Sequence, residues 1–332
     1  MPSATGGIRN ITMTRPRTGK LPLLQIGRLT DATEDRLHQE YSVTALWEQA
    51  DQEKFLAREG KRFRALVTAG GVKVPSSLIA VLPALQVIST RGVGIDHIDC
   101  EAARSRGIAV SNTPGVLTDC VADLAFGALI ATARQLATAD RFVRGGTWLN
   151  MRYPLATRVS RKRLGIVGLG RIGQAVCKRA GGFDMEVRYH SRSERSDSSE
   201  EYCPSLLDLA AWADFLVICV PGGKETRHLV SEAVLNALGP QGYLIHVARG
   251  SVVAEEALIS LLINGQIAGA ALDVYEREPN VPTELLELEN VLLLPHIASS
   301  TKETFADMET LLMDNLHSFF AHGQLLTPVI KD

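Results

Sequence analysis

The chain has 332 residues, of which 45% are hydrophobic and 22% are charged, and its formal net charge at pH 7 is -2. This length suggests about two domains, and the composition is typical of a globular protein with a sizeable core. A net charge so close to zero creates no overall field that would attract nucleic acid or an anionic membrane. No apolar stretch reaches the roughly 18 residues of a membrane span, so we expect neither partner.

The cysteines indicate a protein of a reducing compartment. Their number is odd, and none forms a C-x-x-C pair: Cys100, Cys120, Cys177, Cys203 and Cys219. Such scattered residues predict neither a disulfide framework nor a zinc site. We therefore expect a cytoplasmic protein that holds no metal.

The first twenty residues differ from the rest because they contain basic side chains and no acidic one. They lack the amphipathic apolar face of a transit peptide, so we predict a disordered leader over residues 1–20. A transit peptide, or a true start at Met13, is the alternative.

Short apolar runs alternate with amphipathic segments over residues 21–111. Strands are predicted at 21–26, 41–46, 65–68, 86–89 and 108–111. Segments between them, such as Asp51–Glu59 and Ser76–Leu82, predict helices. This alternation is typical of a parallel sheet with helices on both faces.

A second series of the same kind begins at Arg163. Its strands are predicted at 164–167, 186–189, 215–220, 243–247, 267–272 and 291–294. Several are continuous apolar runs, as expected of strands buried on both faces. Six strands with intervening helices match a full Rossmann sheet. The sequence therefore predicts an α/β protein with two doubly wound parallel sheets.

The segment Asp119–Phe142 lies between the two series and is apolar nearly all round. A helix that is apolar on every side must be buried on every side. We expect one long helix here, either packed centrally within the chain or also in contact with a second subunit.

A glycine-rich turn joins a predicted strand to a predicted helix: Gly168-Leu169-Gly170-Arg171-Ile172-Gly173. The pattern G-x-G-x-x-G in this position is typical of dinucleotide sites. Gly168 permits the tight turn, Gly170 lets the backbone approach the pyrophosphate, and Gly173 allows close packing of helix on strand. The helix N-terminus then offers N–H groups and a partial positive charge to the phosphates.

The end of the next strand predicts which dinucleotide binds. A protein that prefers NAD would usually place Asp or Glu here for the ribose 2′-hydroxyl, but the segment reads Ser191-Arg192-Ser193. A guanidinium between two hydroxyls suits a 2′-phosphate. Arg195 would strengthen such a site, and Glu194 would weaken it. We predict NADPH as the preferred cofactor with NADH possible; a solvated loop is the alternative.

Three residues of catalytic type follow predicted strands of the second series. Arg249, Glu278 and His296 each come shortly after such a strand. In open α/β sheets, ligands bind at the carboxyl ends of the strands. Each residue alone has a structural explanation, but their coincidence at one edge predicts a site.

These residue types fit the reduction of a 2-oxo acid by hydride transfer. Arg249 can clamp carboxylate and carbonyl oxygens. His296 can donate a proton near neutral pH. Glu278 beside it would favour the imidazolium and fix its orientation. With a dinucleotide as hydride source, the set predicts an oxidoreductase.

From about Leu21 to its end, the sequence resembles the D-isomer-specific 2-hydroxyacid dehydrogenases. The matching motifs, besides the glycine-rich turn, are Arg91-Gly92-Val93-Gly94-Ile95-Asp96, Asn112-Thr113-Pro114-Gly115, Ala248-Arg249-Gly250, Leu272-Asp273-Val274-Tyr275, Glu278-Pro279 and Pro295-His296. The resemblance implies a dinucleotide-binding Rossmann domain over 112–298, inserted into a Rossmann-like or flavodoxin-like substrate domain made of 21–111 and 299–332. It also implies a homodimer built through the cofactor domains.

The resemblance further implies roles for individual residues. Arg249 would be the substrate clamp, His296 the acid/base and Glu278 its partner. Backbone N–H groups of Val93 and Gly94 would hold the substrate carboxylate. The cofactor would contact Gly168, Leu169, Gly170, Arg171, Ile172, Ser191, Arg192, Ser193, Val220, Pro221, Thr226, Ala248, Arg249, Asp273, His296 and Ala298.

Within the family, the segments Ser191–Ser193 and Arg91–Gly94 are similar to those of NADPH-preferring glyoxylate/hydroxypyruvate reductases and hydroxyphenylpyruvate reductases. We therefore expect a reductase of small 2-oxo acids that forms D-2-hydroxy acids. Reduction of hydroxyphenylpyruvate or 2-ketogluconate, or a D-lactate-type activity, is the alternative within the family. A dinucleotide-sensing corepressor is the alternative outside enzymes. The substrate pocket is expected near residues 70–72, 91–94 and 148–153.

Overall fold

The computed structural model describes residues 19–329, so most of the predicted leader, residues 1–18, lies outside the described residues. Contacts divide the chain into two compact units. The first holds the described chain up to Thr90, the segment His97–Ser111 and the part from Asp314 on. The second holds Arg91–Asp96 and Asn112–Met313.

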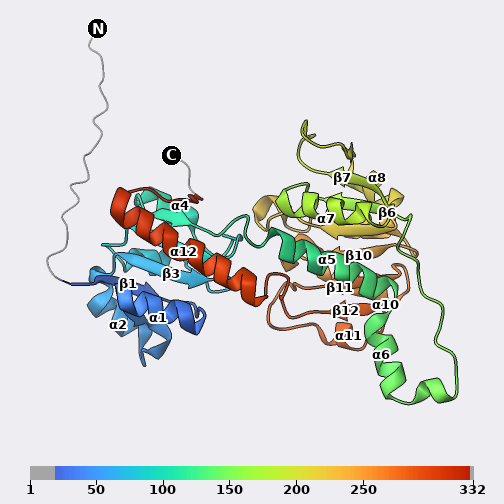
Figure 1. The fold of residues 1–332 in the computed structure, drawn as a ribbon, viewed down its shortest axis with the longest axis horizontal. Coiled ribbons are helices and arrows are strands. Elements are labelled where there is room, and N and C mark those ends of the chain that lie inside the picture. Colours follow the sequence, from blue (N-terminus) through green and yellow to red (C-terminus); the bar gives the residue numbers. More distant parts are fainter. Residues whose placement is uncertain (1–18, 330–332) are drawn as a thin grey trace, which may run out of the picture. The chain divides into compact units, whose positions relative to one another are not determined.

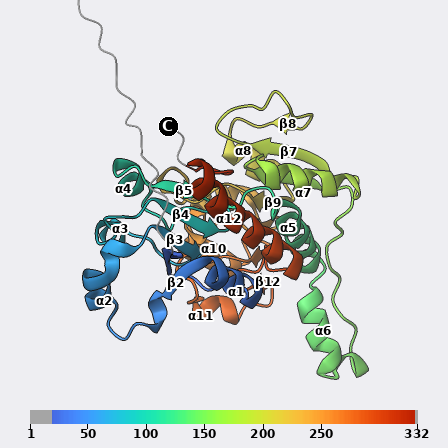
Figure 2. The same ribbon diagram turned by 60° about the vertical axis from the view of Figure 1, so that its left-hand side comes forward.

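The first unit is built on a five-stranded parallel sheet in the order β2-β1-β3-β4-β5. Its strands are β1 (Leu21–Gln25), β2 (Tyr41–Ala45), β3 (Ala65–Ala69), β4 (Val87–Arg91) and β5 (Ala109–Ser111). This order is that of flavodoxin-like sheets. One face carries α1 (Asp31–Glu40) and the part of α12 (Lys302–His322) from Asp314 on, and the other carries α2 (Gln52–Glu59), α3 (Ser76–Ala80) and α4 (Cys100–Ser105) (Figures 1 and 2).

Local sequence explains how these helices begin and what they cover. The Asp51 and Asp99 side chains accept hydrogen bonds from backbone N–H groups in the first turns of α2 and α4, which satisfies donors that a helix start leaves free. Leu24, Leu66 and Ile88 of the sheet are fully buried in the core that these helices share. Strands of a parallel sheet are apolar on both faces because helices cover both.

The second unit is built on a seven-stranded parallel sheet in the order β12-β11-β10-β9-β6-β7-β8. Its strands are β6 (Arg163–Val167), β7 (Glu186–His190), β8 (Glu201–Tyr202), β9 (Phe215–Ile218), β10 (Tyr243–His246), β11 (Gly269–Leu272) and β12 (Val291–Leu293). The strand order reverses between β6 and β9. This is the topological switch point where Rossmann sheets bind dinucleotides.

Helices cover both faces of this sheet as well. One face carries α5 (Thr118–Ala133) and α7 (Arg171–Gly181), and the other carries α8 (Leu206–Trp212), α9 (Glu232–Leu238), α10 (Glu255–Ile263) and the short α11 (Thr283–Leu286) (Figure 1). Within β6, Leu164 and Ile166 pack toward α5 and α7, whereas Val167 packs toward α8–α10, because successive strand residues point to opposite faces. The predicted α/β class with two doubly wound sheets is confirmed.

The single helix predicted over 119–142 is wrong. The structure has α5 and a second helix, α6 (Leu136–Arg144), which are bent by 57° at their break. Gln135 between them has a φ of 52°, which lies in the left-handed region. A residue in this conformation does not continue a right-handed helix, so α5 ends before it. No single described helix is long and apolar enough to cross a membrane; the bent pair passes that test only by length and composition.

Three further parts of the described chain differ from the prediction. The sequence does not predict β8, whose two residues give no alternating pattern. Residues 91–96 and 299–313 were predicted with the first domain, whereas their contacts group them with the second unit. The reason is that Met308 of α12 lies in the second unit's core and that Glu309 forms a buried ion pair with Arg91 at 2.6 Å.

Candidate active site

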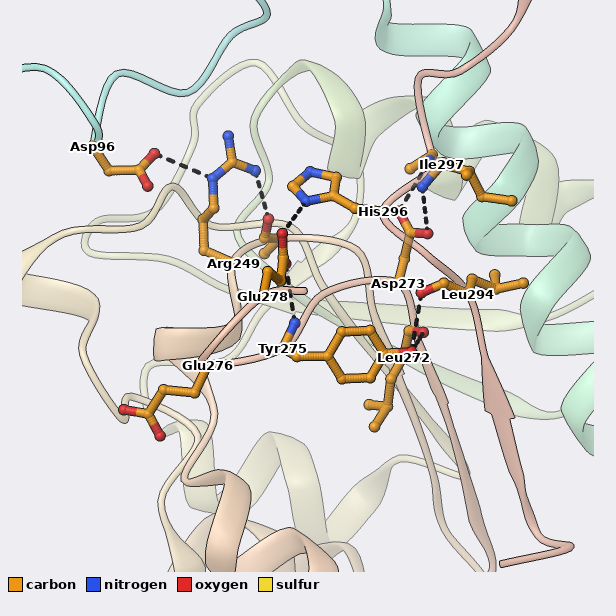
Figure 3. Close-up of polar contacts among 12 residues, drawn as sticks. Asp96, Arg249, Leu272, Asp273, Tyr275, Glu276, Glu278, Leu294, His296 and Ile297 are labelled. Carbon is orange, nitrogen blue, oxygen red and sulfur yellow. Dashed lines mark hydrogen bonds and ion pairs between the residues drawn. The ribbon is translucent and has the colours of Figure 1, made fainter. Parts of the chain in front are cut away.

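Three neighbouring strands deliver the predicted catalytic residues to one edge of the seven-stranded sheet. The strands end in register, with Leu272 of β11 beside Leu293 of β12, and β10 lies on the other side of β11. Arg249, Glu278 and His296 follow these ends along the chain. Figure 3 shows their three side chains gathered at the same edge.

The imidazole of His296 is held by Glu278. Its Nδ1 lies 2.7 Å from Oε2 of Glu278, and the other carboxylate oxygen accepts a hydrogen bond from the backbone N–H of Tyr275 at 3.1 Å. Burial opposes ionisation of this carboxyl, but the hydrogen bond and charge of His296 outweigh it, so the pKa of Glu278 lies below its ordinary value. An ionised Glu278 assigns the Nδ1 proton to the ring and leaves Nε2 for another partner.

The side chain of Asp273 fixes the loop that carries His296. This carboxylate is 1% exposed, and its two oxygens accept backbone N–H groups of Ile297 at 2.7 Å and Ala298 at 2.8 Å (Figure 3). Burial raises the pKa of Asp273, although these two hydrogen bonds act in the opposite direction. His296 itself has a φ of 55°, a left-handed conformation that few non-glycine residues adopt. The structure shows that Asp273 fixes the backbone on which His296 sits, and its contact with the cofactor stays a prediction.

Tyr275 joins the ends of β11 and β12. Its hydroxyl lies 3.2 Å from the carbonyl oxygen of Leu272 and 3.0 Å from that of Leu294, to which it donates (Figure 3). Burial raises the pKa of this phenol to about 12, so it stays a hydrogen-bond donor at neutral pH. The two strands that lead to Glu278 and His296 are thereby held together at their ends.

Arg249 contacts the segment Arg91–Asp96. Its Nε lies 3.1 Å from Oδ1 of Asp96, and an Nη1–H donates to the carbonyl of the preceding residue at 2.7 Å. The side chain keeps 30% of its surface exposed, so part of the guanidinium is open to a ligand. Gly94 lies directly against this guanidinium, which brings the predicted substrate-binding residues Val93 and Gly94 to the same place as Arg249.

The glycine-rich turn lies between β6 and α7, as predicted. Gly168 has a φ of 95°, which favours glycine, and a Cβ there would lie 2.7 Å from the Val220 side chain. A Cβ at Gly173 would lie 2.3 Å from the carbonyl oxygen of Gly168. Gly170 begins α7 without a side-chain cap and has no atom within 4 Å of its Cβ position. These residues fit a dinucleotide, whose pyrophosphate needs close approach to an uncapped helix start.

Two arginines follow the end of β7. Arg192 is 93% exposed at its side chain and lies 3.3 Å from Glu225. Arg195, which the sequence offers as a helper, is paired with Asp197, with its Nε 2.9 Å from a carboxylate oxygen. The hydroxyl of Ser191 donates to the carbonyl of Ser193 at 2.6 Å. Arg192 is therefore the more available of the two cations.

The remaining predicted cofactor residues also come from the second unit. They lie in the turn and first residues of α7, after β9, after β10 and after β12: Leu169, Arg171, Ile172, Val220, Pro221, Thr226, Ala248 and Ala298. The hydroxyl of Thr226 donates to the carbonyl of Pro221 at 2.7 Å, which closes the loop after β9 on itself. These loops follow strands on both sides of the switch point between β6 and β9.

Two residues beside the predicted cluster are not identified as site residues from the sequence. Asp96 stands in a motif that the sequence matches, but its contact with Arg249 spans 153 positions. His246, the last residue of β10, is 2% exposed, and neither ring nitrogen has a hydrogen-bond partner among the described residues. Burial lowers its pKa to about 4, against the smaller effect of the negative charge of Glu278. A polar residue ending an otherwise apolar strand is the signal that could have found it.

Comparisons with known proteins agree with this arrangement. The sequence model of the family described as "D-isomer specific 2-hydroxyacid dehydrogenase, NAD binding domain" matches residues 126–298. A hydroxyphenylpyruvate reductase from Plectranthus scutellarioides is 43% identical over 90% of this chain and 95% of that protein. A glyoxylate/hydroxypyruvate reductase A from Arabidopsis thaliana is 41% identical over 93% and 98%. The solved NADPH-dependent glyoxylate/hydroxypyruvate reductase from Sinorhizobium meliloti, in complex with NADP and malonate, has a TM-score of 0.89 and 39% identity, covering 94% of this chain and 97% of that one.

Proposed function

Because the chain belongs to the D-isomer specific 2-hydroxyacid dehydrogenase family, we propose that it is an NADPH-preferring reductase of small 2-oxo acids, of the glyoxylate and hydroxypyruvate type. The observation that carries the proposal is the cluster of Arg249, Glu278 and His296 at the ends of neighbouring strands. It combines a cation for a carboxylate, an imidazole that carries a proton, and an anion that orients this imidazole.

In the proposed reaction, the bound nicotinamide supplies the hydride that reduces the 2-oxo carbon. His296 holds the transferable proton at Nε2, because its Nδ1 faces Glu278, and delivers it to the former carbonyl oxygen. Arg249 donates hydrogen bonds to the substrate and stabilises the negative charge that develops on that oxygen. Backbone N–H groups of Val93 and Gly94 hold the substrate carboxylate. The product is a D-2-hydroxy acid.

The preference for NADPH is proposed from the end of β7. Its segment Ser191–Ser193 contains no carboxylate, and Arg192 is exposed there. A guanidinium can form paired, charge-assisted hydrogen bonds with a phosphate, whereas a ribose hydroxyl is usually bound by Asp or Glu. The S. meliloti reductase, whose solved complex contains NADP, supports the same cofactor.

Initial rates test this function directly. NADPH and NADH are each combined with glyoxylate, hydroxypyruvate and 4-hydroxyphenylpyruvate, and oxidation is followed by absorbance. We expect fast turnover of the two small acids, with kcat/KM higher for NADPH. A strong preference for NADH would contradict the assignment of Ser191–Ser193. Faster turnover of 4-hydroxyphenylpyruvate would show that an aromatic 2-oxo acid is preferred over the small ones. No turnover with either cofactor would contradict the proposed reductase activity.

A homodimer is part of the same proposal. The segment from α6 onward projects from the seven-stranded sheet (Figures 1 and 2) and exposes a series of large apolar side chains: Leu136, Val143, Trp148, Leu149, Met151 and Leu155. Apolar clusters of this kind mark interaction sites. Light scattering should give twice the chain mass for the wild type. Leu155→Asp should lower it, whereas Leu286→Asp, at an exposed leucine of α11, should not.

A further inference from the structure

The side chain of Arg249 is positioned by contacts along its whole length. At its tip, Asp96 binds Nε at 3.1 Å, and the carbonyl of Ala248 binds Nη1 at 2.7 Å. A guanidinium has five N–H donors in one plane. Two of them are therefore taken by the protein, and these two fix the plane. The three others, one on Nη1 and both on Nη2, stay free of these two contacts.

Two glycines make room for this conformation. A Cβ at Gly94 would lie 1.8 Å from Nη2 of Arg249 and 2.9 Å from Oδ1 of Asp96. A Cβ at Gly222, in the loop after β9, would lie 2.8 Å from Cγ of Arg249. Ordinary side-chain carbons do not approach this closely, so a side chain at either position would displace Arg249. The Arg249 side chain thus passes Gly222 with its aliphatic stem and Gly94 with its guanidinium, which binds Asp96.

The segment that carries Asp96 is itself anchored to the second unit. Thr113 exchanges two hydrogen bonds with Gly92, each of 2.9 Å, and the Asn112 side chain donates to the carbonyl of Val93 at 2.7 Å. Asp96 is therefore a fixed acceptor rather than a side chain on a free loop. Its carboxylate is 36% exposed, so both water and the Arg249 guanidinium stabilise its negative charge.

We propose that Asp96 is a positioning residue, which holds Arg249 by Nε so that the Nη2 side of the guanidinium faces the substrate beside Gly94. This inference rests on the proposed role of Arg249 as the substrate clamp. Arginine side chains lose much rotamer freedom when they bind, so a clamp fixed beforehand binds its ligand more tightly. Asp96 also places a negative charge next to the cation that the anionic substrate must use. The fixed orientation of Arg249 therefore raises substrate affinity, whereas the negative charge of Asp96 lowers it.

Two substitutions separate these effects. Asp96→Ala removes both, and we expect kcat/KM for glyoxylate to fall about 30-fold, with KM raised about tenfold because the clamp is no longer prearranged. Asp96→Asn keeps an oxygen that can accept the Nε–H but removes the charge. It should recover most of the lost kcat/KM and should bind oxalate, a dianionic inhibitor, more tightly than the wild type does. Gly222→Ala, which displaces Arg249 without changing Asp96, should raise KM like Asp96→Ala.

The control is Glu201→Ala, which removes a carboxylate 3.2 Å from Nε of Arg188 at the sheet edge and should leave KM for glyoxylate unchanged. The dissociation constant of NADPH, measured by fluorescence, should stay within twofold in every variant. Wild-type KM in Asp96→Ala, or equal losses in Asp96→Ala and Asp96→Asn, would overturn the inference. A parallel Arg249→Gln variant distinguishes the two claims. Wild-type turnover in Arg249→Gln would overturn both the role of Arg249 as the clamp and the inference about Asp96. If Arg249→Gln loses turnover but Asp96→Ala keeps wild-type kinetics, only the inference about Asp96 is overturned.

Discussion

Two parts of the carboxyl edge of the seven-stranded sheet are built in different ways. At the ends of β11 and β12, Asp273 is buried under two backbone N–H groups, and Glu278 is bonded to His296 at 2.7 Å. At the end of β7, Arg192 is 93% exposed and pairs with an exposed Glu225. An exposed ion pair contributes at most about 1 kcal/mol. The catalytic part is therefore fixed by the fold, whereas the part proposed to select the cofactor can change with little effect on stability.

The largest expected effect concerns the pH dependence of stability and comes from His246, the buried last residue of β10. Burial lowers its pKa to about 4, whereas an unfolded histidine titrates near ~6.5. Between these values the unfolded chain binds more protons than the folded one, so the free energy of unfolding falls as pH falls through this window. The loss approaches about 3 kcal/mol, at up to ~1.4 kcal/mol per pH unit. Above pH ~6.5 this group adds no pH dependence.

Urea unfolding at several pH values between ~4.5 and ~7.5 measures this effect. His246→Asn lacks the titrating group, so its stability should fall less steeply with decreasing pH than that of the wild type. His38→Asn, at an exposed position of α1, is the matched control. If the free energy of unfolding depends on pH in the same way for His246→Asn and the wild type, the predicted contribution of the buried imidazole is contradicted.

The next effect concerns Asp273. Asp273→Ala leaves the N–H groups of Ile297 and Ala298 without their acceptor. Since an unsatisfied buried donor costs about 1–3 kcal/mol, loss of the acceptor for both N–H groups should lower the free energy of unfolding by about 2 kcal/mol. The kcat should also fall at least ~10-fold, because the backbone that carries His296 loses its support.

Asp197→Ala is the comparison for the β7 part, because its carboxylate pairs with Arg195 at the surface. Its unfolding free energy should change by less than about 1 kcal/mol. Equal losses of stability in the two variants would contradict the contrast between the two parts.

The smallest effect concerns Arg192 itself. Arg192→Ala should raise KM for NADPH about 10-fold, since a charge-assisted contact with phosphate is lost. KM for NADH and the unfolding midpoint should stay near their wild-type values, because the side chain is exposed. Rates with both cofactors on the same preparation provide the control. An equal rise in KM for NADH would show that Arg192 does not read the 2′-phosphate.

Much of the fold could be predicted because its signals are local. Buried parallel strands are continuous apolar runs, and the glycine-rich turn has a spacing that few other structures need. The break at Gln135 had no such signal, since neither Gly nor Pro marks it. The two residues of β8 are too few to show a period.

The site was predictable where the residue type itself indicates the chemistry, as with Arg249, Glu278 and His296. It was not predictable where a residue acts by holding another residue that is distant in the sequence. The positioning contacts of Asp273 and Asp96 join residues 24 or more positions apart. Both carboxylates stand in motifs that the sequence matches, but only folded geometry shows which residues they hold.

The most direct test is single-turnover reduction of glyoxylate by the His296→Gln variant with NADPH bound. Glutamine keeps a polar side chain of similar reach but cannot transfer a proton, so we expect NADPH binding to be retained and the rate to fall by about 10²–10⁴. Hydride transfer at the wild-type rate would contradict the assignment of His296 as the proton donor, and with it the proposed use of this edge of the sheet.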